Sequence, residues 1–299
     1  MRLTGVKPLV WSGIYALFLL SLLTPFGIFT IHFMMIPGLV LFMLLERNAF
    51  LLHYAAVLLL FFVITGSFGW PIILISLFFM IPTVVMGTLY KKDTPAHTVI
   101  TAGIITWLAL LVLVILLVSL FGPNVVDVVR EFMVESINTV PEALRQDLPE
   151  GLIDQVITMM TQTIPLYMIT MAFWFVVITH ALGNRLLKAL GVEVSRMKPV
   201  REWMLPKSLV WYYLVALLLD LFTVKDSQSI LVMILWNLIP LLTFAFAVQA
   251  ISFLFYVVHV KNWNRALPLI GIALAFVMPG IVSLLGVFDV AFDLRRRLR

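Results

Sequence analysis

Long apolar runs separated by short polar breaks dominate the chain. A membrane-spanning helix needs about 20 mostly apolar residues, and most of these runs approach or exceed that length. The runs are continuous rather than alternating, which favours helices over the strands of a membrane β-barrel. They cover residues 8–24, 28–45, 49–65, 70–90, 98–121, 164–184, 208–224, 229–259 and 266–288. The pattern predicts an all-α, polytopic helical membrane protein.

The stretch 124–162 departs from this pattern because it is rich in charge and contains no spanning run. Val129 and Phe132 fall on one helical face, whereas Asp127 and Glu131 mark the opposite side. Such segregation is typical of helices that lie on a membrane surface or over a bundle. We therefore expect 124–162 to be an extracytoplasmic insertion of two amphipathic helices.

The last apolar run, 266–288, is interrupted by Pro279 and Gly280. A broken helix is tolerated at membrane depth where its backbone is buried in protein or lines a cavity. We expect a re-entrant C-terminal segment that returns to its side of entry, which leaves about eight transmembrane helices. The alternative is a genuine ninth span, which would place the basic tail on the outside.

Positive charges predict the orientation, because Lys and Arg accumulate in cytoplasmic loops. With the N-terminus cytoplasmic, thirteen such residues fall inside: Arg2, Lys7, Arg47, Lys91, Lys92, Arg185, Lys188, Arg196, Lys198, Arg201, Lys207, Lys261 and Arg265. Three fall outside: Arg130, Arg145 and Lys225. We expect residues 185–207 to form a basic cytoplasmic linker. Residues 1–299 would then form a single transmembrane domain in a bacterial cell membrane.

Composition excludes several classes of function. Hydrophobic residues make up 63% of the chain and charged residues 12%, whereas soluble domains have about 45–50% and about 25%. Cysteine is absent, which excludes disulfides, thiolate metal sites and cysteine nucleophiles. The HExxH, GxSxG, GxxxxGK[ST] and GxGxxG motifs are absent as well. We expect no catalytic residues, no metal or other cofactor, no ATPase activity and no nucleic-acid partner.

Five polar residues inside the apolar runs are candidate ligand-binding residues: His32, His180, Asp220, Asn237 and Gln249. Because polar groups are costly in a bilayer, such residues often mark a polar pocket between helices. The alternative for Asn237 and Gln249 is an interhelical hydrogen bond. The alternative for Asp220 is an interfacial carboxylate near Lys225.

The most specific pattern, Gly-x-Phe-Asp-x-x-Phe-Asp-x-Arg, lies near the C-terminus. It consists of Gly286, Phe288, Asp289, Phe292, Asp293 and Arg295. On a helix the two aspartates share a face. We expect a structural role as an interfacial helix, with the phenylalanines inserted, the aspartates paired with basic residues and the arginines at lipid head groups. The alternative is a plain stop signal of positive charge.

This ending, the chain length, the Glu46-Arg47 junction and the acidic segment before the sixth run resemble the YybS-like family of bacterial multi-pass membrane proteins. That family distantly resembles the substrate-binding S-components of energy-coupling-factor transporters. The S-component resemblance implies that a small vitamin or metal is bound from outside and delivered inward by toppling. It also implies ATPase and scaffold subunits supplied by other chains.

Three functions follow as hypotheses. The first is S-component-like binding and transport of a small solute under an outer lid formed by 124–162, with the bilayer, a transporter scaffold and ATPase subunits as partners. The second is a non-transporting membrane scaffold in cell-envelope biogenesis, with other envelope-biogenesis proteins as partners. The third and least favoured is an intramembrane enzyme that acts on a lipid-linked substrate through the outer carboxylates.

Overall fold

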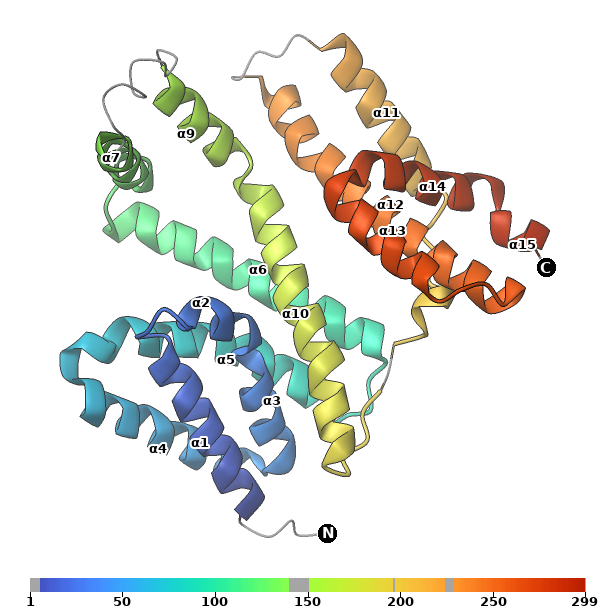
Figure 1. Cartoon of the computed structure of the whole chain (residues 1–299). Coiled ribbons are helices and arrows are strands. Elements are labelled where there is room, and N and C mark those ends of the chain that lie inside the picture. Colours follow the sequence, from blue (N-terminus) through green and yellow to red (C-terminus); the bar gives the residue numbers. More distant parts are fainter. Residues whose placement is uncertain (1–5, 140–150, 196, 224–228, 299) are drawn as a thin grey trace. The chain divides into compact units, whose positions relative to one another are not determined.

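The computed structural model describes residues 6–139, 151–195, 197–223 and 229–298, and every regular element within these ranges is a helix. The chain divides into two compact units (Figure 1). Unit one comprises Met1–Leu120 and Met168–Met197, and unit two comprises Phe121–Tyr167 and Lys198–Arg299. The expected all-α fold class is confirmed for the described residues.

Unit one is built from the N-terminal helices and most of α10 (Ile164–Ala189). Its other elements are α1 (Val6–Ser21), α2 (Gly27–Thr30), η1 (Ile31–Phe33), α3 (Met35–Leu44), α4 (Arg47–Thr65), η2 (Gly66–Gly69), α5 (Trp70–Tyr90) and α6 (Ala96–Phe121). The apolar run expected over 28–45 is therefore a broken helix formed by α2, η1 and α3. The runs 49–65 and 70–90 correspond to α4 and α5.

A hairpin joins α4 to α5. Gly66 has a φ of +59°, a conformation that glycine adopts without the steric cost other residues meet. The hydroxyl oxygens of Tyr54 and Ser76 lie 2.9 Å apart, whereas 22 residues of straight helix would separate them by about 33 Å. The chain therefore reverses at Gly66, and the apolar stretch Arg47–Tyr90 folds as two helices.

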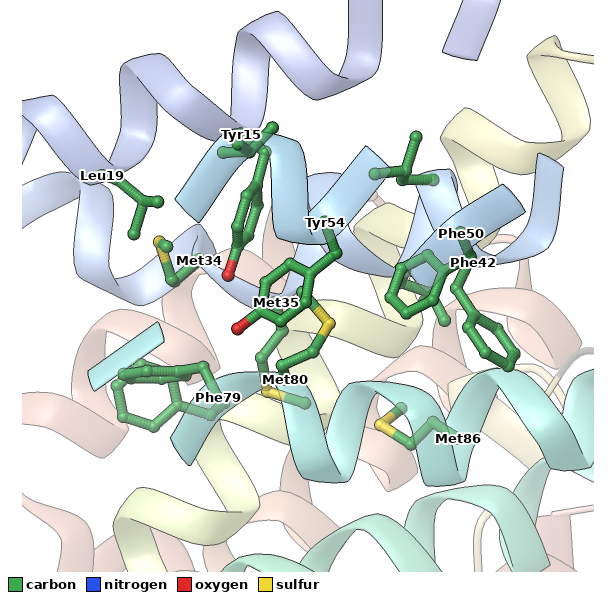
Figure 2. Close-up of a cluster of buried hydrophobic side chains, with 14 of the residues drawn as sticks. Tyr15, Leu19, Met34, Met35, Phe42, Phe50, Tyr54, Phe79, Met80 and Met86 are labelled. Carbon is green, nitrogen blue, oxygen red and sulfur yellow. The ribbon is translucent and has the colours of Figure 1, made fainter. Parts of the chain in front are cut away.

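The core of unit one contains a polar contact among apolar side chains. The rings of Tyr15 and Tyr54 lie with their centroids 5.9 Å apart, and Figure 2 shows their hydroxyl oxygens pointing to the same side. Both hydroxyl groups contact the hydroxyl of Ser76, at 2.7 Å and 2.9 Å. Ser76 is fully buried. This contact joins α1, α4 and α5, because each helix contributes one of the three side chains.

Lys91 links the C-terminal end of α5 to the C-terminal end of α3. Its ammonium donates a hydrogen bond of 2.6 Å to the carbonyl oxygen of Leu45 and lies 4.4 Å from the ring centroid of Phe42. Burial lowers the pKa of the Lys91 ammonium, and the charge of Glu46 acts in the opposite direction.

Unit two contains the remaining helices. They are α7 (Val125–Asn138), α9 (Leu152–Gln162), η3 (Val200–Glu202), α11 (Ser208–Phe222), α12 (Ile230–Lys261), α13 (Ala266–Val277), α14 (Pro279–Phe292) and α15 (Leu294–Leu298). Two helices, α7 and α9, therefore occupy the stretch where amphipathic helices are expected. Residues 140–150, which include Arg145, lie outside the described residues. The extracytoplasmic placement of this stretch stays a prediction.

The C-terminal apolar run forms two short helices instead of one span. Met278 interrupts them with a φ of −137° and a ψ of 61°, outside the helical region. At 12 and 14 residues, α13 and α14 are about 18 Å and 21 Å long. A bilayer core is about 30 Å thick, so each helix covers only part of it.

These two helices reverse direction beside α12. On the way in, Gly271 of α13 packs against Leu254. At the turn, Val282 packs with Ala247 and Ala250. On the way out, the Tyr256 hydroxyl donates a 3.0 Å hydrogen bond to the carbonyl oxygen of Arg295. The segment thus leaves near the end of α12 at which it entered (Figure 1), and its re-entry from one side of the membrane stays a prediction.

Five helical stretches in the described part are long and apolar enough to cross a membrane: Gly27–Leu44, Arg47–Tyr90, Ala96–Phe121, Ile164–Ala189 and Ile230–Lys261. Shorter apolar helices are Lys7–Ser21, Ser208–Phe222, Ala266–Val277 and Pro279–Phe292. The chain is therefore a multi-pass helical membrane protein. The number of crossings stays a prediction.

Candidate functional site

A pocket of about 390 Å³ lies within unit two, where α9 meets α10, α11 and α12. The carboxylate-bearing residue in its lining is Asp220 of α11, and Tyr167 and Trp236 supply aromatic rings. Met159 of α9 and Pro240 of α12 are among the apolar residues that complete the wall. Ligand pockets typically occupy about 300–1,000 Å³ and combine mostly apolar walls with a few polar groups. The pocket has this size and composition.

Asn237 organises the junction of α9 and α10 next to this pocket. In a continuous helix the amide of Leu166 would donate to the carbonyl of Gln162. Here the Asn237 side-chain oxygen accepts from the Leu166 amide at 2.8 Å, and its side-chain nitrogen donates to the Gln162 carbonyl at 2.7 Å. The interhelical hydrogen bond weighed for Asn237 is therefore present. Through it, Asn237 bonds the backbone of Leu166, which lines the pocket.

The amphipathic helices are linked to the same pocket. Arg130 of α7 and Asp154 of α9 form a 2.6 Å ion pair between exposed side chains. Met159, one turn further along α9, lines the pocket. Movement of α7 and α9 would therefore alter the pocket wall.

A second polar site surrounds Asp289 of the C-terminal motif. The Asp289 side chain is fully buried, and Arg295 is 13% exposed. Arg295 Nε and Nη2 each lie 2.9 Å from Asp289 Oδ2. The Gln249 side-chain amide donates to the same oxygen at 2.6 Å, while its own oxygen accepts from the Leu205 amide at 3.0 Å. The buried carboxylate is thus both ion-paired and hydrogen-bonded.

Arg295 also holds the segment around η3 against α12. Its Nη1 donates to the carbonyl oxygen of Arg201 at 2.7 Å, and its Nη2 donates to the Ser252 hydroxyl at 2.9 Å. Ser252 in turn donates to the carbonyl oxygen of Val200 at 2.6 Å. One guanidinium therefore connects α12, α14 and η3.

The motif differs from the expected helix in one respect. Asp293 does not share a helix face with Asp289, because α14 ends at Phe292 and Asp293 has a φ of +49°. Asp293 instead pairs with Lys207 at 2.6 Å. Both aspartates have basic partners. Phe288 and Phe292 are about half exposed and stack on each other at 5.9 Å.

The two candidate histidines lie in unit one and have separate surroundings. His32 stacks on Phe175 with 5.9 Å between ring centroids and meets Trp174 edge-on. His180 is buried, and its Nδ1 contacts the Tyr90 hydroxyl while its Nε2 lies 3.2 Å from the Asn184 side-chain nitrogen. Neither histidine is among the residues that line the pocket around Asp220.

The five candidate ligand residues therefore do not converge within either unit. Of the five, Asp220 lines the pocket, and Asn237 is hydrogen-bonded to Leu166, another lining residue. Gln249 belongs to the Asp289 cluster, twelve residues further along α12. Lys225, the basic residue considered in the sequence analysis as a neighbour of Asp220, lies outside the described residues. Within the described ranges, no three His, Asp or Glu residues form an arrangement suited to a metal ion.

Sequence reasoning missed the α12 residues that complete the Asp289 cluster. Ser252 and Tyr256 lie three and seven residues after Gln249, which places all three on one helical face. This polar stripe on an otherwise apolar helix is the signal that could have identified them. The backbone carbonyl groups of Val200 and Arg201 in η3 could not be identified from the sequence, because every residue type has the same carbonyl group.

Comparison with known proteins identifies the family of the chain. A family model described as predicted membrane protein (DUF2232) matches residues 14–290. The chain belongs to the DUF2232 family. The match ends one residue after Asp289, so the matched region includes the pocket and half of the C-terminal motif, namely Gly286, Phe288 and Asp289.

A curated relative supports the resemblance inferred from the motif. The uncharacterized protein YybS of Bacillus subtilis (strain 168) is 24% identical over 226 residues, which cover 72% of this chain and 73% of the relative. No solved structure matches. The expected YybS-like family is therefore confirmed, while the resemblance to S-components stays a prediction.

Proposed function

We propose that this DUF2232 protein binds a small cationic solute in the Asp220 pocket, in the manner of an S-component and without its own ATPase. The observation that carries the proposal is one carboxylate beside two aromatic side chains in a pocket of about 390 Å³. A carboxylate within an apolar helix is costly and is usually retained for a function. Aromatic faces attract cations by their quadrupoles.

In this proposal the solute compensates the charge of Asp220. The three ion pairs formed between described residues are those of Asp154, Asp289 and Asp293, so Asp220 has no described basic partner. A cationic solute would supply a positive charge to this carboxylate. Neutral solutes would leave the carboxylate uncompensated inside the pocket.

The helices α7 and α9 serve as the lid in this proposal. Met159 of α9 lines the pocket, and an exposed ion pair between Arg130 and Asp154 links α7 to α9. The Asn237 side chain replaces the helical hydrogen bond at the α9–α10 junction, so α9 can tilt there without breaking a continuous helix. A scaffold and ATPase subunits from other chains would drive release into the cell.

The alternative of a non-transporting scaffold in envelope biogenesis has one observation in its favour. Only 6% of the most apolar window of α6 is buried inside the described structure. A helix this exposed offers a long apolar face either to lipid or to the helices of another membrane protein. Retention of envelope proteins with no solute binding would favour this alternative.

The solute proposal predicts stabilisation by organic cations that depends on Asp220. We expect choline, putrescine or benzylamine to raise the melting temperature of the purified full-length protein with saturation, because a ligand of the folded state stabilises it. Loss of a charge-assisted contact worth about 1.5–3 kcal/mol should weaken binding by Asp220→Asn at least about tenfold. Differential scanning fluorimetry measures both quantities.

Glu131→Gln is the matched control, because it removes one exposed carboxylate from α7 without altering the pocket. It should respond to the cations as the wild type does. An equal response of Asp220→Asn and wild type, or the absence of any saturable response, would contradict the proposal.

The orientation used in this proposal makes a separate prediction. The native chain has no cysteine, so single cysteines at the exposed positions Glu135 and Glu193 report without background. We expect a membrane-impermeant maleimide to label Glu135→Cys on intact bacterial cells, and to label Glu193→Cys only after the cells are broken. Labelling of Glu193→Cys alone on intact cells would reverse the assigned orientation.

A further inference from the structure

A second pocket of unit two, of about 570 Å³, lies between the end of α12, the start of α13 and the segment around η3. Arg201, His259 and Arg265 contribute its ionisable side chains, and no acidic residue lines it. Trp263 and Pro268 are among its other residues. It is distinct from the Asp220 pocket, with which it shares no residue.

The wall that carries Arg201 is held in place by its backbone. The carbonyl oxygens of Val200 and Arg201 accept hydrogen bonds from Ser252 at 2.6 Å and from Arg295 at 2.7 Å. The Trp203 indole nitrogen donates to the carbonyl oxygen of Lys198 at 2.8 Å. These bonds fix the main chain while the guanidinium of Arg201 stays at the pocket. The buried Asp289 cluster thereby supports a basic surface outside it.

Neither arginine of the pocket is neutralised by a described carboxylate. The three ion pairs of the described part involve Arg130, Lys207 and Arg295 as their cations. Two guanidinium groups without acidic partners on one pocket favour a ligand with a concentrated negative charge. Arginine suits phosphate in particular, because its planar donors match the spacing of phosphate oxygens.

The surroundings of the pocket match the boundary of a membrane. The apolar helix α12 ends at Lys261, and Asn262 follows in a left-handed conformation. Trp263 is 59% exposed beside the pocket, as is typical of tryptophan at a membrane–water interface. On α13, Leu269 and Ile270 are also exposed. The arginines of the pocket could contact the charged head of a ligand, and the exposed apolar residues of α13 could contact an apolar tail.

We propose that this pocket binds the phosphate-bearing headgroup of an anionic membrane lipid. Arg201 and Arg265 contact the phosphate, Trp263 lies at the level of the glycerol backbone, and the acyl chains run along α13. The C-terminal motif has an indirect part, because Arg295 holds the backbone of Arg201 in position. This site is independent of the solute proposed at Asp220.

The test compares lipid binding by the full-length protein and two variants of equal charge. Dioleoyl-phosphatidylglycerol, dioleoyl-phosphatidylcholine and soluble glycerol 3-phosphate are titrated separately into protein purified in a neutral detergent, and bound lipid is counted by native mass spectrometry. The variant Arg201→Gln with Arg265→Gln removes two charges at the pocket. The control, Arg185→Gln with Lys188→Gln, removes two charges from exposed positions on α10.

We expect phosphatidylglycerol to bind saturably, with an affinity about tenfold weaker in the pocket variant and within about twofold of wild type in the control. Equal weakening in both variants, or equal binding of phosphatidylcholine, would reduce the effect to general charge attraction and overturn the proposal. Glycerol 3-phosphate binding as tightly as the lipid would assign the pocket to a soluble phosphate instead. Should the double variant fail to fold, Arg265→Gln alone carries the test, because Arg265 is exposed.

Discussion

Replacement of Arg295 by methionine is expected to cause one of the largest losses of stability available to a single substitution. Asp289 would keep its buried negative charge but lose the guanidinium 2.9 Å away. Breaking a buried ion pair by removing one partner costs about 3–5 kcal/mol, because the remaining charge is uncompensated. The melting temperature and the yield of monodisperse protein should both fall sharply. Size-exclusion chromatography after a temperature series measures both.

Two controls separate the buried charge from other effects. Lys207→Met breaks the exposed pair with Asp293, whose side chains are 62% and 39% exposed, and should cost at most about 1 kcal/mol. The double variant Asp289→Leu with Arg295→Met removes both buried charges and should recover part of the stability lost by Arg295→Met alone. No recovery in the double variant would show that Arg295 acts mainly through η3 rather than through Asp289.

Gly286→Ala is expected to be similarly disruptive although it adds a single methyl group. A Cβ at this position would overlap the carbonyl oxygen of Phe246 and lie 3.0 Å from the amide nitrogen of Ala250. Both obstacles are backbone of α12, which cannot move aside by changing a rotamer. Overpacking commonly costs about 1–3 kcal/mol, and we expect a loss at or above the upper end. Thermal unfolding of the purified variant provides the measurement.

Gly280 provides the matched control on the same helix. A Cβ added there meets no atom within 4 Å. Because alanine is favoured over glycine in helices, Gly280→Ala should be neutral or stabilise by up to about 1 kcal/mol. Equal melting temperatures for Gly286→Ala and Gly280→Ala would mean that α12 and α14 do not approach each other as closely as described.

The regular elements were predictable because lipid constrains backbone strongly. Backbone groups in a bilayer must be paired within the segment, so long apolar runs such as 98–121 and 229–259 become helices with small shifts at their ends, namely α6 and α12. The break of the last run was also predictable from Pro279. The run 28–45 was described too simply, since a 3₁₀ turn over Ile31–Phe33 interrupts it, and α10 extends to Ala189, into the expected linker 185–207.

The sites were less predictable, because they depend on contacts between distant segments. Asp220 and Asn237 were identified individually as unusual polar residues, but their common neighbours around Thr163 come from a different part of the chain. The partnership of Gln249 with Asp289 crosses forty residues of sequence. Periodicity places a residue on a face of its own helix. It does not say which helix that face meets.

Asp293 shows where a local rule failed. Its spacing from Asp289 predicts a shared helix face only if the helix continues through Phe292. The left-handed conformation of Asp293 ends α14 there, and the side chain turns to Lys207. A helix end of this kind depends on a single backbone torsion, to which hydrophobic periodicity is insensitive.

The short lengths of α13 and α14 have a consequence for how the protein is made. Fourteen residues are too few for independent transfer from a translocon into lipid, and an aspartate within them makes that transfer still less favourable. Beside α12, Asp289 accepts a 2.6 Å hydrogen bond from Gln249, so we expect the segment to leave the translocon only after α12 has done so. For this part of the chain, integration into the membrane and acquisition of tertiary structure are a single biosynthetic event.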